Sequence, residues 1–276
     1  MPAAPQIVWL ASYPRSGNTW VRTLLHGYFE GEPTSSKDIA RLIPDIHAPT
    51  HGGGPARPLA DTGRTLIKTH YLWSRAHPFA GATLGVIYLL RHPRDVLLSS
   101  LNFHRVMGSK GGLAGGKASA DFDAVAYLRT CLNRGGDPGF LDAGFGTWEQ
   151  NARSWTEACD APRLIVRYDA LRADPEPHLR AIVEFLGQTP DPDRVARALR
   201  AGSFDNMRAL EVREKSATGE RNAFFGGSVA TLRKGFKFMD KGRVGGRLDE
   251  IAPGFDAAFD QRFGPAIKAL GLDQPT

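Results

Sequence analysis

IVWLASYPRSGNTWVRTLLHGYF, residues 7–29, is the stretch that decides the fold of this chain. Residues 7–12 form a short, apolar, β-prone run, which predicts a buried strand. Residues 13–18 are turn formers. From Thr19 to Phe29 the apolar residues recur at helical spacing. The stretch therefore predicts a strand, a tight polar loop and a helix in succession, as in an α/β domain.

The loop of this unit has the features of an anion-binding site. The first N–H groups of a helix have no intrahelical partner, and the helix dipole is positive at that end. Gly17 lets the backbone approach a ligand closely, and Arg15, Ser16 and Thr19 add side-chain donors. An ordinary strand-to-helix connection is the competing interpretation. The position of Arg15 and the hydroxyls inside the loop favours an anion.

The loop does not match the Walker A pattern G-x-x-x-x-G-K-[ST] of phosphate-binding loops. Aligned on Gly17 and Thr19, Ser12 takes the place of the first glycine and Asn18 that of the lysine. The sequence therefore predicts a nucleotide ligand, but not an ATPase or kinase of the standard type.

Basic residues stand at the ends of the first predicted strands. Further strands are predicted over residues 65–70, 86–91 and 163–168. Arg15 lies just past the first strand, Lys68 and His70 end the second, and Arg91 ends the third. Because the carboxyl ends of parallel strands meet at one edge of a sheet, we expect these side chains to share one site.

Composition indicates a globular protein with anionic ligands. The chain has 276 residues, 42% hydrophobic and 23% charged, with a net charge of +6 and a pI of about 9.5. This length suits one α/β domain over residues 1–276. We see no metal-binding motif, no disulfide framework in the two cysteines, no signal peptide and no membrane span, so we expect a cytoplasmic location.

Three connecting segments are predicted to shape a substrate pocket. Residues 31–61 are interpreted mostly as surface connection, with a short helix near residues 36–42. Residues 104–145 contain a glycine-rich run, GSKGGLAGGKAS, which is typical of a linker or of a lid. Residues 213–247 are strongly basic and irregular, as in a loop that an anionic ligand orders, or in a plain surface loop.

Three motifs together resemble those of the cytosolic-type sulfotransferases, enzymes that use 3′-phosphoadenosine 5′-phosphosulfate (PAPS). Residues 13–20, YPRSGNTW, are similar to the family's 5′-phosphosulfate loop. Residues 67–70, IKTH, are similar to the segment that carries its catalytic histidine. Residues 88–95, YLLRHPRD, together with Ser99, are similar to its 3′-phosphate motif. The resemblance, to a bacterial-like member, covers most of the chain.

The resemblance implies a single α/β domain with a central parallel sheet flanked by helices, in a P-loop-nucleotide-binding-like fold. It implies transfer of a sulfuryl group from PAPS to a hydroxyl of a small-molecule acceptor, leaving 3′-phosphoadenosine 5′-phosphate (PAP), without a metal, a nucleic acid or a membrane. His70 is implied as general base, with Arg15 and Lys68 as further catalytic residues. The implied nucleotide-binding residues are Arg15, Ser16, Gly17, Asn18, Thr19, Trp20, Arg91, Ser99, Tyr168, Phe204, Arg233, Lys234, Lys241 and Gly242.

The chain departs from the family pattern at three places. Arg15 stands where the animal enzymes usually have lysine, and arginine supplies charge but is a poor proton donor. The basic C-terminal triplet has two candidate matches, residues 233–235 and residues 240–242, and the choice stays open. Gly202 stands where a threonine near the adenine is usual.

Two other functions remain as alternatives. One is a basic nucleotide- or nucleic-acid-binding protein without transferase activity, which the positive charge permits. However, aromatic residues are not interleaved with the basic runs as in single-strand binders. The other is a divergent P-loop kinase, which the missing Gly-Lys pair disfavours.

Overall fold

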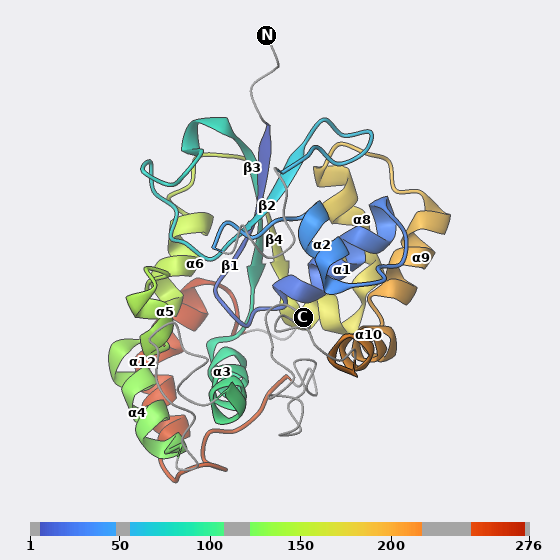
Figure 1. The fold of residues 1–276 in the computed structure, drawn as a ribbon. Coiled ribbons are helices and arrows are strands. Elements are labelled where there is room, and N and C mark those ends of the chain that lie inside the picture. Colours follow the sequence, from blue (N-terminus) through green and yellow to red (C-terminus); the bar gives the residue numbers. More distant parts are fainter. Residues whose placement is uncertain (1–5, 48–55, 108–121, 217–243, 274–276) are drawn as a thin grey trace.

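A four-stranded parallel sheet forms the centre of the molecule in our computed structural model, which describes residues 6–47, 56–107, 122–216 and 244–273 (Figure 1). The strand order is β2-β1-β3-β4, and every pairing is parallel. The strands are β1 (Ile7–Ser12), β2 (Thr65–Thr69), β3 (Thr83–Leu90) and β4 (Arg163–Arg167). The predicted parallel α/β sheet is therefore confirmed.

Helices cover both faces of this sheet (Figure 1). Side chains alternate between the two faces of a strand, and β1 shows this directly. Ile7, Trp9 and Ala11 belong to one apolar core, which α3 (Pro93–Met107), α4 (Ala124–Arg134), α6 (Trp148–Thr156) and α12 (Phe255–Ala269) complete. Val8 and Leu10 belong to the other, which α1 (Asn18–Phe29), α2 (Ser36–Leu42), α8 (Pro175–Phe185) and α9 (Pro192–Ala201) complete. Both faces of β1 are buried, which explains its unbroken apolar sequence.

The helices begin and end near the residues that the sequence indicates. Ser35 and Asp38 form a capping box at the start of α2. Asp174 and Asp191 cap helices that have proline in their first turn. The described helices are α1 (Asn18–Phe29), α2 (Ser36–Leu42), α3 (Pro93–Met107), α4 (Ala124–Arg134), α5 (Pro138–Asp142), α6 (Trp148–Thr156), α7 (Tyr168–Ala173), α8 (Pro175–Phe185), α9 (Pro192–Ala201), α10 (Phe204–Ser216), α12 (Phe255–Ala269) and a 3₁₀ turn, η1 (Ala80–Ala82).

Two predictions about local structure are wrong. Tyr168, predicted to end a strand, begins α7. The turn cluster at residues 135–139 runs into a short helix, α5, because Asp137 accepts hydrogen bonds from the first amides and Pro138 suits the first turn.

A third correction concerns residues 43–47, directly after α2, which belong to the segment predicted to be mostly surface connection. The Ile46 N–H donates to the Lys68 carbonyl (3.1 Å), and the Lys68 N–H donates to the Pro44 carbonyl (2.9 Å). The segment thus adds a short parallel bridge, Asp45 to Lys68, at the free edge of β2. In the described ranges, no helix is both long enough and apolar enough to cross a membrane.

Candidate active site

The loop between β1 and α1 presents a helix end with a cradle in front of it. The first hydrogen bond of α1 runs from the Val21 N–H to the Gly17 carbonyl (3.2 Å), so the amides before Val21 point out of the helix end. Arg15 and Gly17 both have left-handed backbone, with φ of 67° and 96°. The Ser16 hydroxyl is buried and has no hydrogen-bond partner among the described residues. A buried polar atom without a partner is costly, and an anion in the cradle would supply its acceptor.

Asn18 fastens this loop to the strand. Its side-chain amide donates to the Leu10 carbonyl and to the Ser12 hydroxyl, at 3.3 Å each. The side chain is therefore turned back into the protein, and the backbone N–H is the group that Asn18 offers at the helix end. Thr19 is half-buried beside it, and its carbonyl accepts from the Thr23 hydroxyl.

The Tyr168 ring closes one side of the cradle. It packs so tightly on Gly17 that a Cβ there would lie 2.7 Å from Tyr168 Cδ2. The Trp20 and Tyr168 rings meet edge to face, with centroids 6.0 Å apart. Because Tyr168 directly follows the edge strand β4, its contact with Gly17 places the end of β4 next to the loop after β1.

Arg91 and Arg15 connect the loop after β1 to Tyr168 and Ser99. Arg91 Nη1 donates to the Arg15 carbonyl (2.8 Å), and its guanidinium lies 4.1 Å from the centre of the Tyr168 ring. Arg15 Nε in turn donates to the Ser99 hydroxyl (3.1 Å). The residues predicted for the two ends of the nucleotide therefore form one connected cluster.

Gly202, which follows α9, lies next to this cluster, and Phe204 begins α10 two residues later. The Gly202 carbonyl accepts from the Trp20 indole N–H (2.8 Å). A Cβ at position 202 would lie 2.4 Å from Leu24 Cδ2, in the buried core. The packing of Leu24 thus explains why glycine replaces the usual threonine here. Phe204 is half-buried, and its ring lies 5.9 Å from the Arg208 guanidinium on its own helix.

His70 follows β2 and is held in one orientation. His70 Nδ1 lies 2.7 Å from the Ser12 carbonyl, which can only accept, so Nδ1 carries the proton and Nε2 the lone pair. The His70 carbonyl accepts from the Asn151 side chain (2.8 Å). Burial, reinforced by the Lys68 charge, holds the pKa of His70 well below its usual value near 6.5. The imidazole is therefore neutral at pH 7 and can accept a proton at Nε2.

Lys68, two residues earlier, is paired inside the protein. Lys68 Nζ donates to Asp45 Oδ2 (2.6 Å), and its side chain is only 9% exposed. Burial lowers the pKa of Lys68 to about 8, against the opposing attraction of Asp45. Arg22 lies near the same carboxylate, and burial lowers its pKa to about 10. The ammonium group thus sits in a buried charge cluster behind His70.

Comparison with known proteins assigns the chain to a family. The sequence profile of the sulfotransferase domain matches residues 5–271. The chain belongs to the sulfotransferase domain family. This confirms the resemblance that the three motifs predict.

Similar proteins of this family include plant and animal sulfotransferases. The chain is 22% identical to cytosolic sulfotransferase 17 of Arabidopsis thaliana, over 98% of this chain and 77% of the relative. It is 26% identical to sulfotransferase 1A1 of Bos taurus, over 75% of this chain and 67% of the relative.

Two solved structures share the fold of this sulfotransferase-family chain. Mouse sulfotransferase SULT7A1, complexed with PAP, has a TM-score of 0.64 at 20% identity, over 95% of this chain and 84% of that chain. Retinol dehydratase, in a complex with retinol and PAP, has a TM-score of 0.59 at 17% identity, over 97% of this chain and 83% of that chain.

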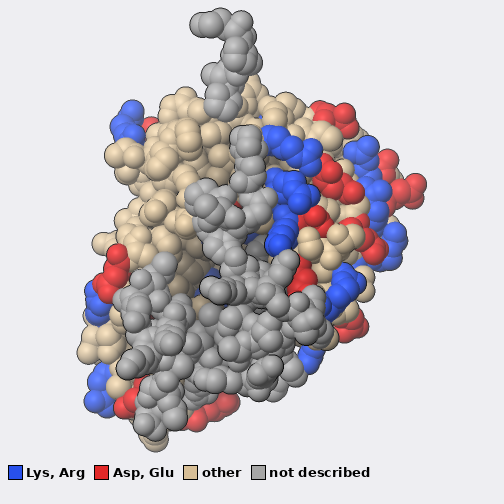
Figure 2. Space-filling model, viewed as in Figure 1, with Lys and Arg blue, Asp and Glu red and all other residues tan. Residues whose placement is uncertain are grey.

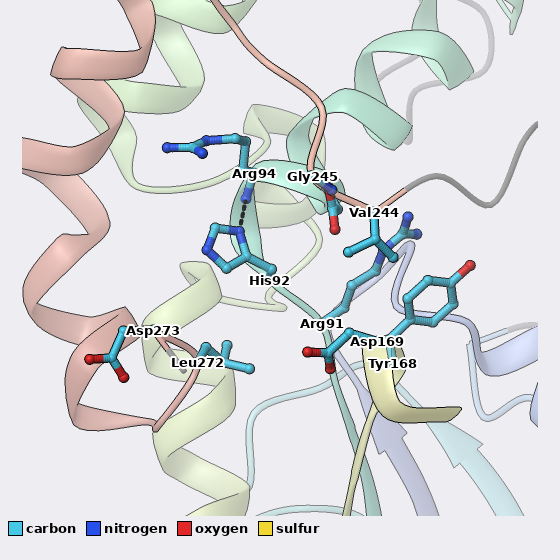
Figure 3. A pocket seen from close by; sticks show the side chains of 10 residues that line it. Arg91, His92, Arg94, Tyr168, Asp169, Val244, Gly245, Leu272 and Asp273 are labelled. Atoms are coloured by element: carbon cyan, nitrogen blue, oxygen red, sulfur yellow. Dashed lines mark hydrogen bonds between the residues drawn. The ribbon is translucent and has the colours of Figure 1, made fainter. Parts of the chain in front are cut away.

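A cavity of about 200 Å³ adjoins the site of this sulfotransferase-family chain at Arg91 and Tyr168 (Figure 3). The Arg91 side chain runs along one wall beside Val244, toward the Tyr168 ring. The other lining residues are His92, Arg94, Asp95, Asp169, Gly245, Leu272 and Asp273. Asp95 is buried and accepts from the Gly245 N–H (3.0 Å), so it fastens residue 245 to the start of α3.

Four predicted site residues of this sulfotransferase-family chain lie outside the described residues: Arg233, Lys234, Lys241 and Gly242. The glycine-rich run at residues 108–119 and most of the basic segment at residues 213–247 also lie outside them. Among the residues that are described, no group of three or more His, Cys, Asp or Glu could hold a metal ion. On the face shown in Figure 2, Lys and Arg alternate with Asp and Glu over α2 and α9.

Sequence reasoning missed four polar residues that support the site of this sulfotransferase-family chain: Asp45, His47, Asp95 and Asn151. Asp95 had a usable signal, since an acidic residue in the first turn of a helix invites amide partners. The other three act through contacts with segments far away in the sequence, which no local pattern reveals.

Proposed function

We propose that this protein transfers a sulfuryl group from PAPS to a hydroxyl of a small-molecule acceptor. One observation carries the proposal: the Tyr168 ring contacts both Gly17 and Arg91, so the loop after β1 and the ends of β3 and β4 meet at one place. Two neighbours with this fold are PAP complexes, and the curated relatives are sulfotransferases. The relative from Arabidopsis thaliana is named a cytosolic sulfotransferase, which supports the predicted cytoplasmic location.

The residues present suit a nucleotide that carries a phosphosulfate at one end and a 3′-phosphate at the other. The Ser16 hydroxyl, the amides at the start of α1 and the Arg15 guanidinium offer donors to the first. Arg91 and Ser99 offer donors to the second. Trp20 and Tyr168, which meet edge to face, would offer aromatic surface to the adenine.

The chain's own groups can then assist an in-line transfer. PAPS supplies the sulfuryl group and a phosphate leaving group. His70 Nε2 takes the proton from the acceptor hydroxyl as its oxygen bonds to sulfur, and the sulfur–oxygen bond to the phosphate breaks with its electron pair on the phosphate oxygen. Arg15 stabilises that growing charge as a fixed cation rather than as a proton donor.

The acceptor would enter beside an apolar wall. The Phe145 ring lies 5.7 Å from the His70 imidazole. Retinol dehydratase, a solved structure with a similar fold, is known in complexes with retinol and with androsterone. Both observations support a small organic acceptor rather than a macromolecule.

The test is transfer of ³⁵S from labelled PAPS to a panel of phenols, sterols and alcohols, with the wild type and His70→Ala side by side. We expect a labelled product with the wild type and none with the variant, while PAP raises the melting temperature of both. Stabilisation by PAP without transfer to any acceptor would favour the nucleotide-binding alternative. Equal turnover by His70→Ala would remove His70 from the reaction.

A further inference from the structure

His47 lies next to His70, the proposed general base, but it has no role of its own in the proposed transfer reaction. The Nε2 atom of His47 accepts a hydrogen bond from the backbone N–H of His70, at 2.7 Å. The two imidazole rings are stacked, with centroids 5.7 Å apart and planes 12° from parallel. The His47 ring thus contacts both the backbone and the ring of His70.

His47 is itself held firmly by the bridge at the edge of β2. Its backbone N–H donates to Asp45 Oδ1 (3.0 Å), and Asp45 Oδ2 accepts from Lys68 Nζ (2.6 Å). The ring packs between Tyr71 and Phe145, with centroid distances of 4.1 Å and 4.7 Å. A salt bridge and two aromatic rings therefore fix the orientation of the His47 imidazole.

The charged and titratable groups around His47 keep it neutral. Burial, followed by the charges of Lys68 and His77, lowers the pKa of His47 to about 3, although Asp45 favours the cationic form. Because the hydrogen bond from His70 needs a lone pair at Nε2, this neutrality keeps the bond in place across the physiological pH range.

We propose that His47 is a positioning residue, which fixes the backbone and ring of His70 so that Nε2 faces the acceptor hydroxyl. This inference rests on the proposed function, in which His70 is the base. Three hydrogen bonds hold His70: its N–H donates to His47, its carbonyl accepts from Asn151, and its Nδ1–H donates to the Ser12 carbonyl. Loss of the first removes one of the two bonds that hold the backbone of His70, and the ring is carried by that backbone. A misplacement of about 1 Å can slow a reaction about 100-fold.

Two substitutions separate the hydrogen bond from the stacking. His47→Phe keeps a flat ring against His70 but removes the acceptor. His47→Gln removes the ring but offers an amide oxygen to the His70 N–H. We expect His47→Phe to lower kcat by about 10- to 100-fold with an unchanged KM for PAPS, and His47→Gln to stay within about 5-fold of the wild type. His178→Ala, on α8, is the control and keeps full activity.

The ¹⁵N resonances of the His70 ring give a readout that a purely structural role would not move. We expect the wild type and His47→Gln to show one tautomer, protonated at Nδ1, and His47→Phe to show a mixture. Wild-type kcat in His47→Phe would overturn the proposal. Equal losses in both variants, with equal losses of thermal stability, would overturn it too. Full turnover by His70→Ala would instead refute the assignment of His70 as the general base, whatever the activities of the His47 variants.

Discussion

Replacing Gly17 by alanine tests the contact that joins the phosphate loop to the end of β4. Gly17 has a φ of 96°, where an L-residue with a Cβ loses about 1–2 kcal/mol. The new methyl would also lie 2.7 Å and 2.9 Å from two carbons of the Tyr168 ring, so the ring or the loop has to move. Overpacking of this kind costs about 1–3 kcal/mol. We therefore expect Gly17→Ala to destabilise the protein by about 2–5 kcal/mol.

Gly31 provides a matched control for this substitution. It has almost the same backbone, with a φ of 99°, but a Cβ added there would have no atom within 4 Å. Gly31→Ala should therefore cost only the backbone penalty of about 1–2 kcal/mol. The difference between the two variants isolates the contact between Gly17 and Tyr168.

The assay is urea unfolding of both variants, followed by calorimetric titration with PAP. We expect Gly17→Ala to bind PAP at least about 10-fold more weakly, a loss of about 1.4 kcal/mol, because Tyr168 also packs on Arg91. Gly31→Ala should bind PAP normally. In a Tyr168→Ala background, Gly17→Ala should cost no more than Gly31→Ala. Equal stabilities of the two single variants, without coupling to Tyr168, would refute the reasoning.

Substitutions at three further positions probe charge and space. Arg15→Lys should keep kcat within about 10-fold of the wild type, whereas Arg15→Gln should lower it about 100- to 1,000-fold, because charge is what this position supplies; similar rates for both would contradict that role. Asp45→Asn leaves the Lys68 ammonium buried without its counter-charge and should cost about 3 kcal/mol in urea unfolding at pH 7. Since the pKa of Asp45 is depressed, the wild type should lose this stability as the pH falls below about 4, and Asp45→Asn should not; parallel acid curves would count against the pairing. Gly202→Thr must displace the Leu24 side chain and should lower the free energy of unfolding by about 1–3 kcal/mol, and an unchanged urea midpoint would show that Leu24 yields freely.

The sheet and the loop after β1 could be predicted because local patterns determine them. The apolar run at residues 7–12 and the turn residues that follow indicate the strand and its end. The rule that parallel strands end at one edge then placed Arg15 and Arg91 together, and the structure joins them by a hydrogen bond. The motifs supplied the family, and the sulfotransferase domain profile confirms it.

The remaining parts of the site depend on contacts between segments far apart in the sequence. Nothing in the sequence around Asp45 indicates that it pairs with Lys68, 23 positions later. His47 lies in the segment interpreted as surface connection, because its acceptor role needs the backbone of His70, 23 positions later. Tyr168 is predicted to end a strand because tyrosine is enriched in strands, whereas in the structure it begins α7.

Calorimetric titration with PAP and 5′-AMP in EDTA, and with ATP both in EDTA and in magnesium without EDTA, tests the central claim that one site binds both ends of a PAPS-type nucleotide. We expect PAP to bind at least about 10-fold more tightly than 5′-AMP, because Arg91 and Ser99 lose a charged partner when the 3′-phosphate is missing. ATP should bind weakly, with or without magnesium. Equal binding of PAP and 5′-AMP, or tighter binding of magnesium ATP, would contradict the assignment.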